Sequence, residues 1–169
     1  MNLKEKTKED LKTALKEGKE IEVSTLRLLL SAIFNKEKEK RYKLSKQKPE
    51  FEEKDLEKES QLVDEEVIEV ISSEIKKRKE SILEFGKGQR QDLVEKETKE
   101  KEILEKYLPE QLPEEKVKKL VQEAIAKTGA KEIKDMGKVI QEVMPKVKGK
   151  ADGSLVSRIV KDLLIPKTE

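Results

Sequence analysis

Apolar residues recur at helical spacing through most of this chain, and this periodicity constrains the fold more than any other feature. Although 45% of the residues are charged and only 3% are aromatic, the apolar residues form stripes three or four positions apart. Glu and Lys, which supply most of the charge, form helices well and pair favourably four residues apart. The sequence therefore predicts an all-α fold with long solvated faces, and not a disordered chain.

An N-terminal helical bundle is expected within residues 1–108. Helices are predicted over residues 2–17, 20–41, 64–85 and 91–108. Gly18 is expected to cap the first helix and Asp64 to begin the third as its N-cap. Residues 26–34 form the most apolar segment, which predicts that the second helix is the central one. Residues 42–61 are polar, contain a proline and show no sustained period, so a flexible connection is expected there.

The stripes of the third and fourth predicted helices include three charged residues. Arg78 falls on the stripe of the third helix, which otherwise carries valine, isoleucine and phenylalanine. Glu97 and Glu100 fall on the stripe of the fourth helix, beside leucine and tyrosine.

A small C-terminal domain of three helices is expected over residues 113–169. The run LPEQLP at residues 108–113 is a natural boundary before it. The first helix is predicted to start near Pro113 and to end at Gly129. The second is predicted to begin with Asp135 as N-cap and to stop before Pro145, and the third to begin around Asp152. Three helices of this length make a core that is marginal alone.

The composition excludes several classes of site. The chain contains no Cys and no His, so thiolate or imidazole metal ligands, disulfides and the usual general base are ruled out. We therefore predict no catalytic residues, no metal and no cofactor. No apolar run approaches the ~20 residues that a membrane span needs, and the N-terminus lacks the apolar region of a secretory signal. The expected location is the cytoplasm, away from the membrane.

Two remaining patterns could carry chemistry, and both have simpler explanations. Ser72 and Ser73, with Lys76 and Lys77 nearby, superficially resemble a Ser-Ser-Lys amidase arrangement. They lie inside a helical stripe, however, where a hydroxyl bonds its own backbone and no free N–H groups form an oxyanion hole. The acidic residues 64–66 could bind Mg²⁺, but at a helix start such residues more often serve the cap and the helix dipole.

Positive charge is concentrated late in the chain. The net charge is +2, yet residues 138–161 contain six basic residues against two acidic ones. The turn at residues 146–154 combines alternating lysines with two glycines and leads into a helix start, where free N–H groups favour anions. A tight helix–helix turn with solvated lysines explains the same pattern nearly as well. The candidate residues for binding a phosphate backbone are Lys138, Lys146, Lys148, Lys150, Arg158 and Lys161, with Gly149 and Gly153 shaping the turn.

Three late segments resemble the hallmark of the GatB/YqeY family. They are DMGKV at residues 135–139, MPKVKGKADG at residues 144–153 and VSRIVK at residues 156–161. Residues 23–33, 77–82 and 107–109 resemble the helices of the stand-alone YqeY-type members. The resemblance spans nearly the whole chain and implies a helical bundle followed by a three-helix domain like the GatB tail.

This resemblance implies kinship with the tail of the GatB subunit of the glutamine-dependent aspartyl/glutamyl-tRNA amidotransferase, where the tail helps to hold the tRNA. The activation domain and the glutaminase of that enzyme have no counterpart in this chain. The leading expectation is an accessory protein that binds tRNA through its C-terminal domain without catalysis of its own. One alternative is a component of carbon–nitrogen ligase activity with glutamine as amido-N-donor. Another is an adaptor that docks onto a translation factor or an amidotransferase component.

Overall fold

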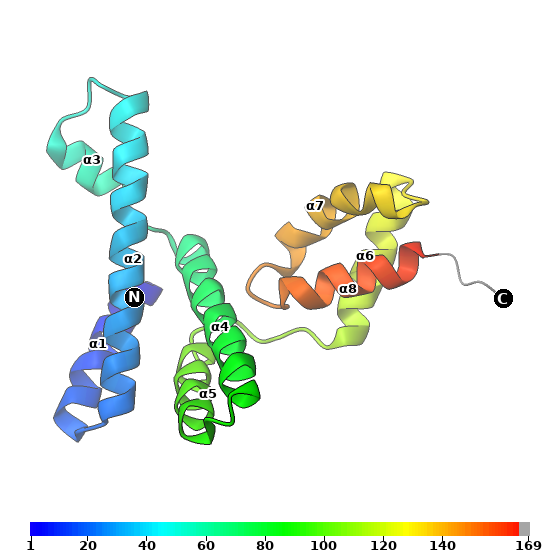
Figure 1. The fold of residues 1–169 in the computed structure, drawn as a ribbon. Coiled ribbons are helices and arrows are strands. Elements are labelled where there is room, and N and C mark those ends of the chain that lie inside the picture. The colour runs from blue at the N-terminus through cyan, green and yellow to red at the C-terminus, as the bar shows by residue number, and fades with distance from the viewer. Residues whose placement is uncertain (166–169) are drawn as a thin grey trace. The chain divides into compact units, whose positions relative to one another are not determined.

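The structure, a computed structural model that describes residues 1–165, contains helices and no strand within that range (Figure 1). The predicted all-α fold is confirmed. The chain divides into two compact units, Met1–Tyr107 and Leu108–Glu169. No helix among the described residues is long and apolar enough to cross a bilayer.

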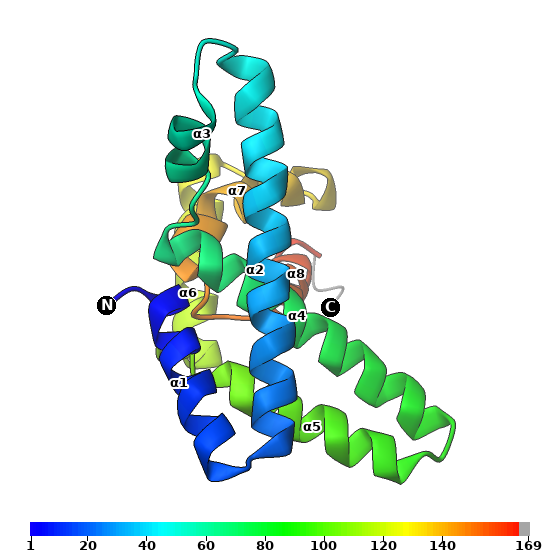
Figure 2. The ribbon, with the colours of Figure 1, turned by 90° about the vertical axis from the view of Figure 1, so that its left-hand side faces the viewer.

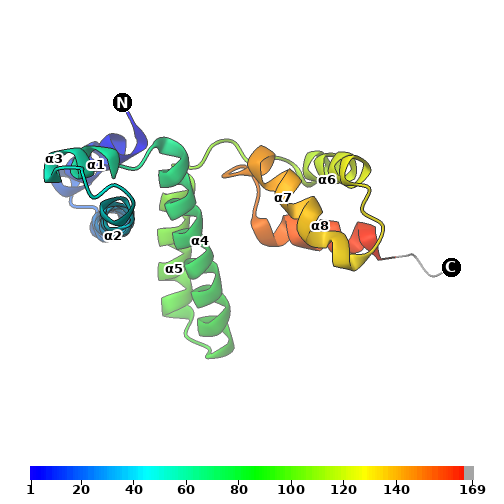
Figure 3. The ribbon, with the colours of Figure 1, turned by 90° about the horizontal axis from the view of Figure 1, so that it is seen from above.

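The first unit is built from two helical hairpins and a short extra helix. Helix α1 (Leu3–Glu17) and helix α2 (Glu20–Gln47) lie side by side in two perpendicular views (Figures 1 and 2). The turn between them needs Gly18, which takes the left-handed conformation with φ 69°. Helix α4 (Asp64–Lys87) and helix α5 (Gln91–Glu105) form the second hairpin (Figure 3). Helix α3 (Glu53–Glu59) lies beside the C-terminal half of α2.

Helix α2 is the centre of the first unit, because it contacts α1, α3, α4 and α5. Its residues Leu26, Leu29 and Ile33 are at most 1% exposed. Its opposite face is not covered, since the Leu28 side chain is 52% exposed and Phe34 is 56% exposed. The neighbouring helices therefore bury only part of this apolar segment.

The structure differs from the flexible connection expected at residues 42–61. Helix α2 continues to Gln47, and α3 forms within the remainder of the segment. The side chain of Leu56 is buried, and the Arg41 guanidinium donates to the Ser60 hydroxyl at 3.3 Å. The Lys40 ammonium also reaches the Gln61 carbonyl at 3.1 Å. These contacts join α2 to residues 60 and 61, about twenty positions away, so the local periodicity of the sequence could not predict them.

Asp64 is the first residue of α4 and not its N-cap, and its side chain contacts a different helix. Its carboxylate accepts a hydrogen bond from the backbone N–H of Leu3 at 2.8 Å, at the start of α1. The residue before it, Val63, occupies the N-cap position of α4, and its N–H donates to Glu66 at 3.0 Å. Glu66 also accepts from Lys40 at 2.7 Å. The acidic run therefore holds helix ends and neighbouring helices in place, and the described residues contain no cluster suited to a metal ion.

The last residue of the first unit, Tyr107, is tied to the first helix. Its hydroxyl donates to the Asp10 carboxylate at 2.6 Å, and the Lys6 ammonium lies 5.5 Å from the ring centroid. Burial, followed by the hydrogen bond to Asp10, raises the pKa of Tyr107 well above its usual range. The phenol is therefore held in its protonated, donating form.

Replacing Tyr107 with phenylalanine is expected to remove part of the alkaline sensitivity of the first unit. A pKa raised on folding adds stability that is fully present below the unfolded pKa of about 10 and is lost as pH rises above it. Wild-type protein should therefore lose about 1 kcal/mol more per pH unit than Tyr107→Phe between about pH 10 and 12. Urea unfolding at a series of alkaline pH values checks this, and parallel curves for the two proteins would contradict it.

Up to residue 165, the second unit consists of three helices and one short 3₁₀ turn. Helix α6 (Glu114–Thr128) is followed by η1 (Ile133–Asp135), α7 (Met136–Val147) and α8 (Gly153–Leu164). All three helices contact one another. The core that they share consists mainly of valine, supplemented by alanine, isoleucine and leucine. Its buried residues are Val117, Val121, Ala124, Ala130, Val139, Val143, Val147, Val156, Ile159, Val160 and Leu164.

Helix α7 begins after Asp135 as predicted, but it extends beyond its predicted end. It continues through Pro145 to Val147, where a stop had been expected. A proline removes one helical N–H and strains the preceding turn, but Val143 and Val147 are both buried, and their packing offsets that loss. At the other end, Asp135 does not cap α7 with its side chain. Its carboxylate accepts instead from the N–H of Lys131 at 3.2 Å, which is the leading cause of the lowered pKa of Asp135.

Candidate functional site

The glycine–lysine turn predicted as a binding element connects α7 to α8. The carbonyl of Val147 accepts hydrogen bonds from the N–H groups of Lys150 at 2.8 Å and Ala151 at 3.0 Å. Gly149 has a φ of 71°, a conformation that side-chain-bearing residues rarely adopt. Gly153 is the first residue of α8, and a Cβ there would meet nothing within 4 Å. The turn geometry therefore requires Gly149, whereas nothing around Gly153 requires a glycine.

The start of α8 differs from the open anion site expected from the sequence. Asp152 is the N-cap, and its carboxylate accepts from the N–H of Ser154 at 2.9 Å and from the Ser154 hydroxyl at 2.7 Å. A negative charge thus already occupies the position where a phosphate would approach the helix end. Any attraction of this turn for an anion has to come from its lysine side chains.

Three of the six candidate cations belong to this turn. Lys146, Lys148 and Lys150, named here the turn cluster, alternate along the chain and are all exposed. Lys146 lies 3.7 Å from the carboxylate of Glu142. That carboxylate is shared with Lys127 at 2.7 Å, and its pKa is lowered chiefly by the hydrogen bond from Lys127. The turn cluster therefore keeps an excess of positive charge at the surface.

The other three candidates lie on the helices away from the turn. Lys138 is in the first turn of α7, about 12 Å along the axis from Lys146 at the usual helical rise, and it pairs with Asp135 at 3.4 Å. Arg158, in the middle of α8, lies 3.3 Å from the exposed carboxylate of Glu114. Lys161 is in the last turn of α8. Fold and chain order thus gather the turn cluster, whereas the other three candidates occupy separate positions.

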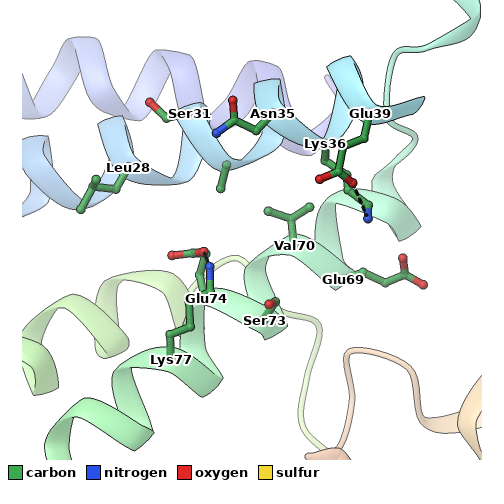
Figure 4. Close-up of a pocket in the computed structure, with 11 residues that line it drawn as sticks. Leu28, Ser31, Asn35, Lys36, Glu39, Glu69, Val70, Ser73, Glu74 and Lys77 are labelled. Carbon is green, nitrogen blue, oxygen red and sulfur yellow. Dashed lines mark hydrogen bonds and ion pairs between the residues drawn. The ribbon is translucent and has the colours of Figure 1, made fainter. Parts of the chain in front are cut away.

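A groove in the first unit was not anticipated from the sequence. It has a volume of about 520 Å³ and lies between α2 and α4 (Figure 4). Ser31 and Asn35 line it from α2, and Ser73 and Lys77 line it from α4. The two sides come from segments far apart in the chain, so no local motif could reveal it.

Ser72 and Ser73 lie within α4, as their position in the stripe predicted. The ammonium of Lys77 is paired with the Glu74 carboxylate at 2.6 Å. A general base must lie within hydrogen-bond reach of the proton that it abstracts, and here the Lys77 nitrogen is hydrogen-bonded to Glu74. The arrangement therefore supplies no activated nucleophile from this pair of serines and Lys77.

A buried ion network fastens α4 to α5 where the two stripes placed charged residues. The Arg78 guanidinium bonds the carboxylate of Glu74 through Nη1 and lies 3.3 Å from the Glu100 carboxylate through Nη2. All three side chains are buried, and Nε of Arg78 has no hydrogen-bond partner among the described residues. Glu97 lies beside this network, and its pKa is raised by burial and then by the charge of Glu100. The network thus joins two helices, and Glu74 also lies on the rim of the groove.

Comparison with known proteins adds two findings. The sequence profile of the family described as Yqey-like protein matches residues 36–164. A curated relative from Kluyveromyces lactis, "Altered inheritance of mitochondria protein 41, mitochondrial", is 40% identical over 101 residues. This match covers 59% of the chain and 45% of the relative, so it spans less than half of that protein. The name of the relative places that protein in mitochondria, and a cytoplasmic location for this chain stays a prediction.

Proposed function

This chain belongs to the YqeY-like protein family, and from that premise we propose that it is a tRNA-binding accessory protein linked to glutamine-dependent tRNA amidation. The observation that carries the proposal is the exposed turn cluster on the tight turn between α7 and α8. A phosphate backbone rewards such positive charge without requiring catalytic residues. The resemblance to the amidotransferase tail supports the link to tRNA amidation. The positive charge of the turn cluster supports binding through the phosphate backbone.

The expected contact is with RNA backbone and shape rather than with stacked bases. The second unit, residues 108–169, contains no Phe, Tyr or Trp, and stacking on single-stranded bases depends on aromatic side chains. Lysine ammonium groups instead release condensed counterions when they neutralise phosphates, which makes affinity fall steeply with salt. Binding should therefore discriminate weakly among tRNA sequences and strongly among salt concentrations.

Replacing Lys146, Lys148 and Lys150 together with glutamine is expected to weaken tRNA binding by about 10- to 100-fold at low salt. The slope of log affinity against log salt should flatten by about 2 units, because each lost phosphate contact removes somewhat less than one unit. Fluorescence anisotropy of labelled tRNA across a series of KCl concentrations measures both quantities.

A matched control carries the same loss of charge on α6, outside the turn between α7 and α8. Lys116, Lys118 and Lys119 are all exposed on α6, and replacing these three with glutamine should reduce binding much less. Equal losses for the two triple variants would show a general charge effect instead of a site. Wild-type protein with no measurable tRNA affinity at low salt would end the proposal.

The purified protein can also be used to test the alternative functions that the family resemblance implies. Amidated product from mischarged Glu-tRNA, glutamine and ATP with this protein alone would make it an enzyme. A requirement for added amidotransferase subunits would make it a component of the ligase. Recovery of a translation protein after nuclease treatment, without RNA, would favour an adaptor.

A further inference from the structure

The segment that precedes α6 in the second unit, residues 108–113, is hydrogen-bonded to the turn that carries the turn cluster. The side-chain amide of Gln111 donates to the Gly149 carbonyl at 2.7 Å and to the Pro109 carbonyl at 2.9 Å. The backbone N–H of the next residue, Leu112, donates to the Lys150 carbonyl at 2.7 Å. Two consecutive residues of the segment therefore bind two consecutive carbonyls of the turn.

We propose that Gln111 and Leu112 form a strap that holds the turn cluster in its binding conformation. In this role both are positioning residues, because they act on the turn and not on a ligand. The part of the inference that concerns RNA rests on the proposed function. The part that concerns the conformation of the turn stands on the hydrogen bonds alone.

The strap is anchored at its far end. The Leu112 side chain packs against the core of the second unit, and Pro113 is the N-cap residue of α6. A proline also restricts the backbone of the residue before it, which keeps Leu112 extended. The donors that face the turn are thus held by the fold, although Gln111 itself is exposed.

The turn needs such support because its own backbone is short of constraints. Its internal backbone hydrogen bonds both end on the Val147 carbonyl, which accepts from Lys150 and Ala151, and Gly149 is a flexible residue in a left-handed conformation. The three lysines of the turn cluster repel one another when held close together. Without the strap, the turn would sample more conformations, and a bound polyanion would have to order it at the expense of affinity.

Coupling between the strap and the turn must act in both directions. If the strap favours the conformation that binds an anion, then a bound anion stabilises the strap by the same factor. A polyanion on the turn cluster should therefore protect residues 108–113 from opening. Protection of residues 108–113 from opening would therefore indicate that a polyanion is bound at the turn.

Gln111→Met tests the strap, because methionine keeps the length of the side chain and removes its N–H donors. Gln122→Met, at an exposed position on α6, is the matched control. Trypsin cleavage after Lys148 and Lys150 of the full chain, followed by mass spectrometry, measures opening of the turn. We expect cleavage there to rise about 3- to 10-fold in Gln111→Met and to stay unchanged in Gln122→Met, with the same melting temperature in both.

Binding of tRNA gives the second readout. Gln111→Met should weaken it about 3- to 10-fold while leaving the salt slope unchanged, because no charge is removed. The salt dependence therefore distinguishes Gln111→Met from the triple lysine variant, in which the slope of log affinity against log salt is flatter. Unchanged cleavage in Gln111→Met would show that the strap does not hold the turn. Increased cleavage with unchanged tRNA affinity would show that the held conformation is not the binding conformation. If wild-type protein binds no tRNA, the RNA part falls with the proposed function, and the cleavage result still decides whether the strap holds the turn.

Discussion

Replacing Arg78 with alanine is expected to lower the free energy of unfolding of the first unit by about 3–5 kcal/mol. The guanidinium bonds Glu74 on its own helix and lies 3.3 Å from Glu100 on α5. Removing it takes this cation away from the buried carboxylate of Glu100 and leaves the carboxylate of Glu74 with Lys77 as its partner. A buried charge that loses its partner is far more costly than a lost surface pair. A loss of this size is a large fraction of the stability of an ordinary domain.

Urea unfolding followed by circular dichroism measures this loss, and amide exchange should show earlier opening of α4 and α5. Lys76→Ala is the matched control, because Lys76 is an exposed neighbour whose ion pair with Glu80 spans 3.9 Å. Its effect should stay within about 0.5 kcal/mol.

The buried charges, rather than the loss of volume, should account for the effect of Arg78→Ala. Replacing Arg78, Glu74 and Glu100 together with leucine removes the charges and retains apolar volume, and this triple variant should recover much of the stability. If Arg78→Ala unfolds within about 1 kcal/mol of wild type, the network does not fasten the hairpin. If the triple leucine variant is as unstable as Arg78→Ala, packing and not charge is responsible.

Replacing Ile159 with alanine is expected to cost the second unit about 2–5 kcal/mol. Ile159 lies in the middle of α8 with 5% of its surface exposed, in a core made mostly of valine. A three-helix unit of this size has little stability to lose, so the change should unfold it in a large fraction of molecules near physiological temperature. Helical signal should fall, and tRNA binding should fall with it.

The variant Ile159→Val tests whether lost packing causes the effect, because valine keeps most of the buried volume. Its cost should be only about 0.5–1.5 kcal/mol. Asp162→Ala, at an exposed position on the same helix, should leave stability within about 0.5 kcal/mol. Near-native stability of Ile159→Ala would show that the core of the second unit is not closely packed around α8.

The helices with strong periodicity were predicted closely, and the reasons are local. Gly18 and Gly129 end α1 and α6 in the left-handed conformation expected of a C-terminal glycine. Asp152 caps α8 as expected from its position before an apolar stripe. In each case the residue that determines the helix end lies within a few positions of that end, so helix propensity and capping chemistry were enough to predict it.

The features that sequence reasoning missed depend on contacts between distant segments. The carboxylate of Asp64 accepts a hydrogen bond from the first residue of α1, a helix that begins about sixty positions earlier in the chain. The polar stretch after α2 forms α3 because Leu56 is buried and Ser60 meets Arg41. Pro145 is accommodated inside α7 because Val143 and Val147 pack on both sides of it. No periodicity or capping rule contains these partners.

The candidate site shows the same division. The sequence identified the lysines and Gly149, because charge and turn chemistry are properties of the residue types themselves. It could not show that Asp152 fills the start of α8 with its own carboxylate, or that Arg158 faces Glu114. It also could not show that Gln111 and Leu112 bind the turn from another part of the chain.

Family, fold class and the charge of the late turn were therefore determined by the sequence alone, because motif, periodicity and composition are properties of neighbouring residues. The tertiary structure decided which carboxylate caps which helix, which cations gather and which are separated, and what holds the turn in shape. Burial of the Arg78 network and attachment of the strap both need two segments to meet in space. Only folding brings those segments together, and the energies associated with desolvation and close hydrogen bonding arise only then.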